Sequence, residues 1–344
     1  MTVTPGPGPA DRSVLAAGAL AMAPRLEIAN ERVAATVLLP DADRGFYRGT
    51  RFDWSGMIAS LRCGGQEFYG LWFDRISAEV GDFVFQDEGI VAGPNTAALG
   101  PAEGFDPGEP LGWAQAAAGG AFLKIGVGLL RKPADGAPYN SFRTYEFVEP
   151  GAWQVVPQPD SVLFIHTVED AAGGLGCEYR KELRLLPGEP RLQITHRLRN
   201  TGSRPFSTTT FNHNFLTLGG DPTALGARAG AAFPLGAPTS IGGPIRLDGA
   251  TAIFERALAP GEIAKAIFEL GHGGAAYDIH VMNREGAGFR AQSDTPLSRL
   301  VLWSIHRTLS LEPFVEISVP AGDVRTWTTL YTYSAGSSAI GFSS

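Results

Sequence analysis

The chain has 344 residues, of which 44% are hydrophobic and 18% are charged, and its formal net charge is −7. These values are typical of a globular protein with an ample core, and they exclude an intrinsically disordered chain. The negative charge and the lack of a long basic run argue against nucleic acid or an anionic membrane surface as a partner. The apolar runs are also shorter than the ~20 residues that a membrane-spanning helix needs.

The first 24 residues differ in composition from the rest of the chain. Residues 1–12 are rich in proline and glycine, and residues 14–23 are small and apolar. We interpret residues 1–24 as a disordered or weakly ordered tail before a single domain at residues 25–344. The small residues resemble a signal-peptide cleavage site, but Asp11 cancels Arg12 and no positive excess precedes them. A cytoplasmic protein is therefore expected, with a secreted or periplasmic one as the alternative.

Short alternating segments separated by glycine and proline follow the tail. The segments that we expect to be strands are 33–39, 57–63, 66–73, 122–130, 143–148, 153–156, 161–168, 177–185, 191–198, 205–210, 252–256, 263–270, 277–283, 288–292, 300–305, 312–319 and 324–333. None of them shows sustained helical periodicity, so the pattern predicts an all-β sandwich or barrel. Residues 86–120 hold few periodic apolar positions, and we expect a long surface excursion there.

Cysteine and glycine spacing argues against common cofactors. Cys63 and Cys177 are far apart, and no Cys/His spacing typical of a metal site occurs, so neither a disulfide framework nor a metal ion is expected. The segment Gly126-Val127-Gly128 lacks the third glycine and the following helix of a dinucleotide-binding fingerprint. The glycine spacing therefore does not indicate a dinucleotide site.

His213 stands at the end of a predicted strand that is rich in β-branched and hydroxyl residues. Alternation along the strand puts Phe211, His213 and Phe215 on one face, and Asn212 and Asn214 on the other. An imidazole between aromatic rings has apolar walls, and its pKa can be held where it exchanges protons near neutral pH. The alternative is a core histidine that is hydrogen-bonded to the backbone.

Glu312 is the second candidate for proton transfer. Its neighbours Leu311, Pro313 and Phe314 are apolar, and desolvation there would raise its pKa and make it a better base. Glu316 falls on the same strand face, ~13 Å away along the strand. Spacing alone leaves the choice between the two carboxylates open, and the apolar surroundings favour Glu312.

A third group lies at Arg48, Arg51, Asp53 and Trp54. A sugar-binding site needs guanidinium or carboxylate groups that can hydrogen-bond to sugar hydroxyls, and a flat aromatic ring that covers the C–H face of the sugar. The alternative is a set of ordinary surface ion pairs. Trp303, further along the chain, either lines a pocket or packs in the core.

Five motifs follow one another along the chain. They are RGTRFDWSGMI at 48–58, KIGVGLLRKP at 124–133, FNHNF at 211–215, LWSI at 302–305 and EPFV at 312–315. Their number and order resemble those of bacterial aldose 1-epimerase-like proteins of the galactose mutarotase superfamily, over residues 28–334. This resemblance implies a large antiparallel two-sheet supersandwich with a concave sugar cleft, and an activity that interconverts the α and β anomers of a monosaccharide or sugar derivative.

The resemblance also implies roles for single residues. His213 corresponds to the acid that protonates the ring oxygen, and Glu312 to the base that takes the proton of the anomeric hydroxyl; no cofactor takes part. The residues expected to bind the substrate are Arg48, Arg51, Asp53, Lys124, Asn212, Asn214 and Trp303.

The chain departs from the family at one position. Better-known aldose 1-epimerases have another sugar-contacting histidine well upstream of the acid histidine, whereas the first histidine here is His166. Lys124 lies in about the corresponding region. Two other functions stay open: a non-catalytic carbohydrate-binding protein, and a lyase or glycoside-cleaving enzyme. The latter would need a further acid or base, such as Tyr139, Tyr145 or Asp294.

Overall fold

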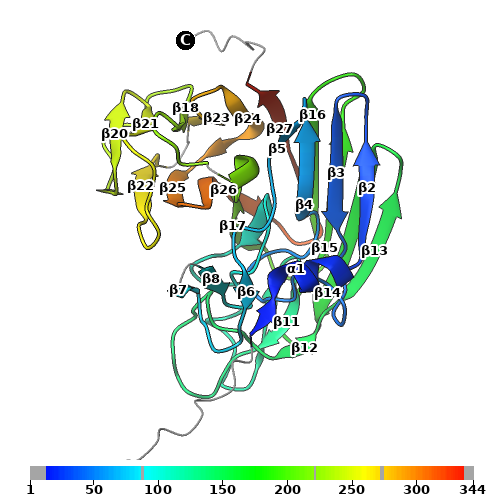
Figure 1. Ribbon diagram of the computed structural model, residues 1–344. Coiled ribbons are helices and arrows are strands. Elements are labelled where there is room, and N and C mark those ends of the chain that lie inside the picture. Colours follow the sequence, from blue (N-terminus) through cyan, green and yellow to red (C-terminus); the bar gives the residue numbers. More distant parts are fainter. Residues whose placement is uncertain (1–12, 87–88, 221, 272–274, 337–344) are drawn as a thin grey trace, which may run out of the picture.

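The computed structural model describes residues 13–86, 89–220, 222–271 and 275–336 (Figure 1). Within these ranges the helical elements are one seven-residue helix, α1 (Ala16–Met22), and one 3₁₀ turn, η1 (Leu218–Gly220). The all-β fold that the alternating segments predicted is confirmed. Both cysteines are free and buried. No helix in the described part of the chain is long and apolar enough to cross a membrane.

Two large antiparallel sheets form most of the molecule. The ten-stranded sheet has the spatial order β13 (Ala152–Pro157), β14 (Ser161–Asp170), β15 (Leu175–Leu185), β16 (Arg191–Asn200), β27 (Val324–Ala335), β24 (Ala287–Leu297), β23 (Ala275–Met282), β18 (Arg228–Ala231), β21 (Thr251–Phe254) and β20 (Ile245–Asp248). The six-stranded sheet has the order β19 (Ser240–Gly242), β22 (Ala264–Glu269), β25 (Arg299–Ile305), β26 (Thr308–Val319), β17 (Phe206–His213) and β9 (Ala102–Phe105).

Three smaller sheets complete the fold. The first contains β2 (Arg25–Ala29), β3 (Val33–Leu38), β4 (Ile58–Cys63) and β5 (Gln66–Glu67). The second contains β1 (Val14–Leu15), β6 (Arg75–Ile76), β8 (Gly89–Ala92) and β7 (Phe83–Gln86), and the third β10 (Ala121–Lys124), β11 (Gly128–Arg131) and β12 (Phe147–Glu149). Figure 1 shows the last two sheets and α1 at the lower end of the molecule, below the large sheets.

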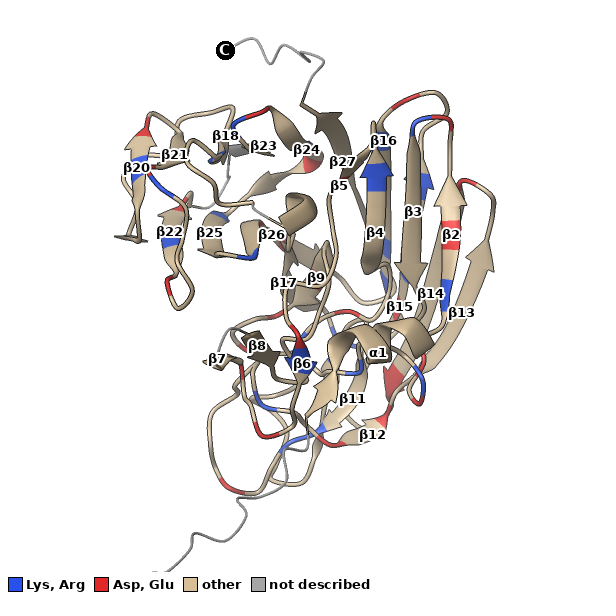
Figure 2. Cartoon of the chain, in the orientation of Figure 1, with Lys and Arg blue, Asp and Glu red and all other residues tan. Residues whose placement is uncertain are grey.

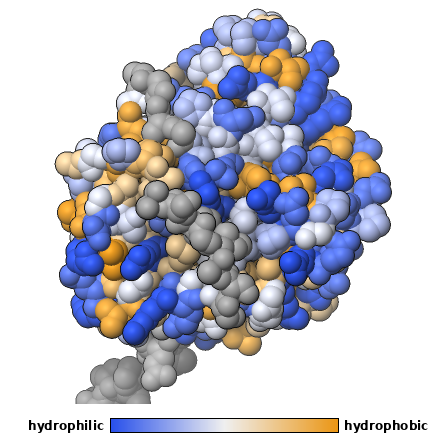
Figure 3. Space-filling model, turned by 90° about the horizontal axis from the view of Figure 1, so that it is seen from above, coloured by the Kyte–Doolittle hydropathy of each residue, from blue (hydrophilic) through white to orange (hydrophobic). Residues whose placement is uncertain are grey.

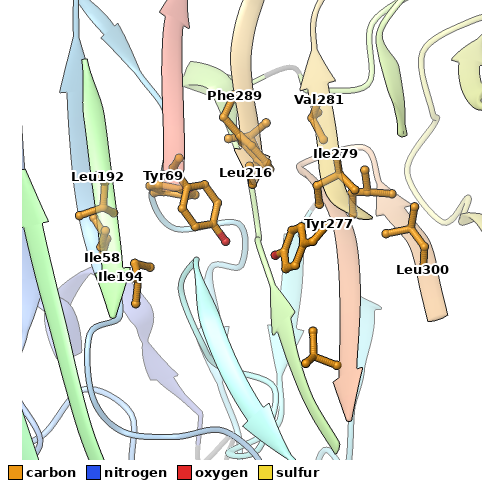
Figure 4. Packing of buried hydrophobic residues seen from close by; sticks show 14 of the residues in the cluster. Ile58, Tyr69, Leu192, Ile194, Leu216, Tyr277, Ile279, Val281, Phe289 and Leu300 are labelled. Carbon is orange, nitrogen blue, oxygen red and sulfur yellow. The ribbon is translucent and has the colours of Figure 1, made fainter. Parts of the chain in front are cut away.

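The core lies where the inner faces of the large sheets and of the sheet β2–β5 meet. Buried side chains from these faces approach one another across the interior in Figure 4, among them Ile58, Leu192 and Ile194 on one side and Ile279, Val281 and Leu300 on the other. All six are at most 1% exposed. The alternation that the sequence displays is the cause, since successive residues of a strand point to opposite faces of its sheet.

Charges of both signs are interspersed along the chain rather than separated by sign (Figure 2). Several pairs are local, such as Arg180–Glu178 at 2.8 Å and Arg184–Glu182 at 2.6 Å on the partly exposed face of β15. Exposed pairs of this kind typically contribute about 0–1 kcal/mol. These surface pairs therefore contribute little to the stability of the fold, which depends mainly on the buried interior.

Two expectations about chain segments need correction. Residues 13–24 are not a loose tail, because β1 pairs with β6 and Ala16 of α1 is fully buried. Residues 89–106 are not part of a surface excursion, because β8 and β9 are buried, whereas most of residues 107–120 are exposed or partly exposed. The small residues there reflect close packing: a Cβ atom on Gly104 would lie 2.5 Å from the ring of Phe211. Alanine and glycine make the alternating hydrophobic pattern of a strand harder to detect, but their small size allows the backbone to approach a neighbouring ring closely.

Candidate active site

His213 is the last residue of β17, between β9 and β26 in the six-stranded sheet. The strand ends there because the chain turns: Phe215 has a φ of 42°, in the left-handed region. The register pairs Phe211 with Phe314 of β26, and His213 with Ala102 of β9. β26 therefore holds the strand as far as Phe211, and β9 holds it as far as His213, where β17 leaves the sheet.

The structure brings His213 and Glu312 together, as the sequence predicted. Nε2 of His213 lies 3.4 Å from Oε1 of Glu312, and the two residues are 4% and 7% exposed. Glu316 lies further along the same strand, opposite Thr209, and is exposed. The contrast in burial separates the two glutamates that spacing alone could not distinguish.

Aromatic rings form the walls around the pair. The ring of Phe215 stacks on the His213 imidazole at a centroid distance of 3.7 Å, and Phe52 meets it edge-on at 6.0 Å. Trp303 of β25 lies 5.2 Å from the imidazole and is partly exposed. Trp72 stacks on the far side of Phe215 at 5.3 Å, which fixes that ring in place. The apolar environment inferred from the flanking phenylalanines is present.

This environment shifts the pKa values of both side chains in the direction that favours their uncharged forms. Burial raises the pKa of Glu312 to about 7, although Arg51, Lys265 and Arg299 act in the opposite direction. Burial, together with the nearby positive charge of Arg51, lowers the pKa of His213 well below its usual value. Below about pH 7 the pair therefore carries one titratable proton, and this proton rests on the carboxyl group of Glu312.

Arg51 is the one charged side chain from the motif at 48–58 that acts on the pair. Its guanidinium carbon lies 4.6 Å from the ring centroid of Phe52 and 4.5 Å from that of Phe142, and the side chain is partly exposed. Cation–π contacts with these two rings hold the guanidinium group in place. Arg51 and Trp303 are the expected substrate-binding residues that lie beside the pair.

Arg48 and Lys124 have other contacts. Arg48 is exposed, donates to the carbonyl of Asp43 at 2.9 Å, and lines a separate cavity of about 640 Å³. Lys124 is buried, and its amino group donates to the backbone carbonyls of Phe105 and Asp106. Burial lowers its pKa to about 8. Both basic groups therefore have partners within the protein, and their expected contact with a substrate stays a prediction.

The two asparagines that flank His213 face away from it. Asn214 donates to the carbonyl of Leu311 at 2.7 Å and accepts from the hydroxyl of Tyr331 at 3.0 Å, so its amide joins β17 to β26 and β27. Asn212 lies opposite Glu103 of β9 and is 7% exposed. Asn214 is thus a structural residue here rather than a group that is available to a sugar.

Asp53 is also internal, as part of a buried ionic cluster. Nζ of Lys181 lies 3.2 Å from Asp53 and 3.3 Å from Glu103, and Glu103 also binds Nε2 of His196 and accepts from Thr210 at 2.9 Å. All five residues are at most 4% exposed. Burial would raise the pKa of Glu103, but the adjacent His196 and Lys181 lower it to about 2. Glu103 and Lys181 therefore form a buried ion pair at the centre of the cluster.

The cluster positions the chain segment that carries Arg51. The backbone amide of Asp53 donates to the carbonyl of Glu103 at 2.7 Å, and Phe52 forms an isolated bridge with Gly104. Phe52 in turn contacts the imidazole of His213. The side chains that meet at the ionic cluster thus determine where Phe52 and Arg51 lie relative to the catalytic candidates.

Sequence reasoning missed Glu103 and Lys181, although a signal for Lys181 exists. Lys181 occupies an inward position in the alternating series of β15, between the buried Tyr179 and Leu183. It pairs in register with His196, an inward residue of β16. Two basic groups facing the core from neighbouring strands require an acid. Glu103 offered no such signal, because its segment is short and rich in small residues.

Comparison with known proteins finds similarity at the level of structure. No protein-family profile and no curated protein sequence matches the chain. A galactose mutarotase-like protein from Clostridium acetobutylicum is 11% identical, with a TM-score of 0.52 over 90% of this chain and 95% of that one. The galactose mutarotase related enzyme from Lactobacillus acidophilus is 12% identical, with a TM-score of 0.50 over 93% and 100%. The chain has the galactose mutarotase-like fold.

A third solved structure extends the comparison. A protein from Synechocystis sp. PCC 6803 is 13% identical to the chain, with a TM-score of 0.51 over 91% of this chain and 96% of that one. At these identities the galactose mutarotase-like fold is shared while most side chains differ, so the roles of single residues rest on the geometry above.

The ionic cluster leads to a prediction about stability. Lys181→Met removes a buried cation and leaves Asp53 and Glu103 without it, which is expected to lower the free energy of unfolding by about 3–5 kcal/mol. The matched change Arg180→Met, on the partly exposed face of the same strand, is expected to cost under about 1 kcal/mol. Urea denaturation of both variants measures the difference, and equal losses would contradict the structural role of the cluster.

Glu312 leads to a second prediction, about the pH dependence of stability. Its pKa is raised from 4.5 to about 7, so folding favours the protonated form. The contribution of protonated Glu312 to the free energy of unfolding is complete below the pKa of the unfolded state and is lost as the pH rises through the pKa of the folded state. The loss amounts to about 3 kcal/mol, because each pKa unit corresponds to ~1.4 kcal/mol. Glu312→Gln keeps the shape and cannot ionise. The variant is expected to be more stable than wild type at about pH 8 and equally stable near pH 4.

Urea denaturation of wild type and Glu312→Gln at both pH values tests this prediction. Glu316→Gln is the control, because Glu316 is exposed and its replacement is expected to leave the pH dependence of unfolding unchanged. A stability difference between wild type and Glu312→Gln that does not change with pH would show that burial does not shift this carboxyl group.

Proposed function

We propose that the protein is an aldose 1-epimerase-like isomerase that interconverts the α and β anomers of a sugar through His213 and Glu312. The observation that supports this function most strongly is the buried contact of 3.4 Å between the two side chains, among aromatic walls. A proton donor and a proton acceptor held side by side in an apolar site match the needs of ring opening, where one oxygen gains a proton as another loses one.

One proton on the pair is sufficient for the reaction. The pKa shifts place it on Glu312 in the free protein. Its transfer to Nε2 of His213 gives the carboxylate and imidazolium that the family resemblance implies. Glu312 then takes the proton of the anomeric hydroxyl while His213 protonates the ring oxygen. The ring opens, the C1–C2 bond rotates, and closure on the other face returns each proton with the roles reversed, so that no cofactor is consumed.

The partly exposed side chains beside the pair suggest how a sugar binds. The indole of Trp303 offers a flat surface to the C–H face of a sugar ring, and the guanidinium of Arg51 offers donors to its hydroxyls. Arg48, Asp53, Lys124 and Asn214 are not included in the proposed site, since their polar groups are bound elsewhere.

A carbohydrate-binding protein without turnover is the second candidate function. Burial of a glutamate whose pKa rises to about 7 favours catalysis, because a purely binding cleft gains little from an acid that destabilises the fold. A lyase or glycoside-cleaving enzyme needs a further acid or base, and two of the three candidates have other partners: Tyr145 bonds to the backbone of Asn140, and Asp294 binds the amide of Thr328. The third, Tyr139, has a buried hydroxyl group for which the described residues offer no hydrogen bond.

The carboxylate assignment is tested by paired variants. Glu312→Gln and His213→Asn are each expected to slow enzyme-catalysed anomer exchange by about 10²–10⁴-fold, which is the usual worth of one proton transfer. Glu316→Gln is expected to exchange anomers like wild type, since its side chain is exposed on the same strand. Exchange of a panel of aldoses, followed by NMR with the spontaneous rate subtracted, measures all three. Loss of activity in Glu316→Gln would overturn the assignment, and unchanged activity in the other two would favour the binding protein.

The single proton shared by His213 and Glu312 leads to a prediction about the pH dependence of anomer exchange. If the active state holds one proton on the pair, catalysis is lost as that proton dissociates from the free protein, so kcat/KM is expected to fall as the pH rises through about 7. A lone carboxylate base would give the opposite result, a rate that rises through the same pKa. Initial rates of anomer exchange across the neutral range separate the two forms.

A further inference from the structure

A second cavity lies at the far end of the ten-stranded sheet, away from the segments that form the His213 site. Its volume is about 810 Å³, and residues of β18, β21, β23 and β24 line it together with the loop at 232–236. Along β23, Ile279 and Val281 are fully buried in the core, whereas His280 and Met282, on the opposite face, line the cavity. The inner face of this part of the sheet thus belongs to the core, and its outer face forms the floor of a pocket.

Three basic side chains from neighbouring strands meet in this cavity. His280 pairs in register with Arg290 of β24, and Met282 pairs with Arg228 of β18, so the three groups share the outer face. Burial lowers the pKa of His280, and the charges of Arg290 and Arg228 lower it further, while Asp278 opposes them. The imidazole therefore senses a positive potential from both neighbours.

The acidic groups nearby are already occupied. Asp278 accepts from Nε of Arg290 at 2.7 Å and from the amide of Gln292 at 3.0 Å. Asp248, at the rim, is largely exposed and lies 3.7 Å from Arg246. In the described part of the chain Arg228 has no carboxylate within ion-pair distance, so one full positive charge in the cavity is left without a counter-ion.

The remaining walls of the cavity are apolar. Phe233 and Leu235 come from the loop, and Ile253 and Met282 from the strands. The loop is tied to the sheet by a hydrogen bond from the amide of Ala232 to the carbonyl of Asp278 at 2.9 Å. Seen from above, hydrophobic side chains gather at the left of Figure 3, the side on which Figure 1 draws β20 and β21.

We propose that this cavity is a second binding site, for a small organic anion that carries a phosphate or carboxylate group on an apolar body. Arg228 binds the anionic group, the Arg290–Asp278 pair and His280 supply the polar floor, and Phe233 and Leu235 cover the apolar part. The volume is within the roughly 300–1,000 Å³ that ligand pockets usually have. An exposed arginine fork matches the geometry of either anion.

Phenyl phosphate is the probe that tests the site, because it joins the two required features. Isothermal titration calorimetry is expected to show that the wild-type protein binds phenyl phosphate more tightly than two simpler compounds. Inorganic phosphate lacks the apolar part, and phenol lacks the charge. Arg228→Gln is expected to weaken the binding of phenyl phosphate at least tenfold, because a tenfold change in affinity corresponds to about 1.4 kcal/mol for the lost charged contact. Titration of benzoate asks in the same way whether a carboxylate replaces the phosphate.

Two control variants make the outcome decisive. Arg325→Gln removes an equal charge at an exposed position of β27, and Glu312→Gln alters the proposed active site; both are expected to bind phenyl phosphate like wild type. Arg290 is left intact, because its loss would leave Asp278 without its cation. Equal weakening in Arg228→Gln and Arg325→Gln would overturn the proposal, as would no binding to wild type, or equally tight binding of inorganic phosphate. Loss of binding in Glu312→Gln alone would assign the anion to the sugar site instead.

Discussion

The ion pairs of Lys181 are the constraint on which the arrangement of the rest depends. Removing a charged side chain from water costs several kcal/mol per ion, and only a complete set of partners offsets it. Here the interacting groups come from four separate parts of the chain: Lys181 of β15 pairs with Asp53 of the loop and Glu103 of β9, and Glu103 also pairs with His196 of β16. The two large sheets must therefore meet in one relative position, since any other would leave a buried charge unpaired.

Two buried glutamates with opposite pKa shifts show how the fold separates structure from chemistry. Glu103 has a lysine and a histidine beside it, and its pKa falls to about 2, whereas Glu312 has aromatic walls and more distant cations, and its pKa rises to about 7. The first glutamate stays ionised and holds the sheets together. The second changes its protonation near neutral pH, which is what an acid–base catalyst requires. The same side chain thus serves two purposes because its neighbours differ.

Local sequence pattern was sufficient to find the proposed catalytic pair. Alternation placed His213 beside aromatic rings, and the apolar flank of Glu312 predicted its raised pKa. The pattern gave no sign of the partners of Asp53 and Asn214, because these lie far away in sequence: Lys181 is 128 residues from Asp53, and Tyr331 is 117 from Asn214. A polar residue in a motif has the same appearance whether it faces a ligand or a distant strand, and only the pairing of the sheets distinguishes the two.

The burial of the pair also determines how a substrate would reach it. His213 and Glu312 are at most 7% exposed, so a sugar must displace or pass their partly exposed neighbours, Arg51 and Trp303. Arg51 is held by two phenylalanine rings rather than by a carboxylate, and exposed cation–π contacts are worth only about 0.5–1 kcal/mol each. Moving it is therefore inexpensive compared with moving Phe52, which is anchored to β9. In the proposed reaction the rigid parts hold the proton donor and acceptor, and the weakly held Arg51 is the part that adapts when sugar hydroxyls replace the rings as its partners.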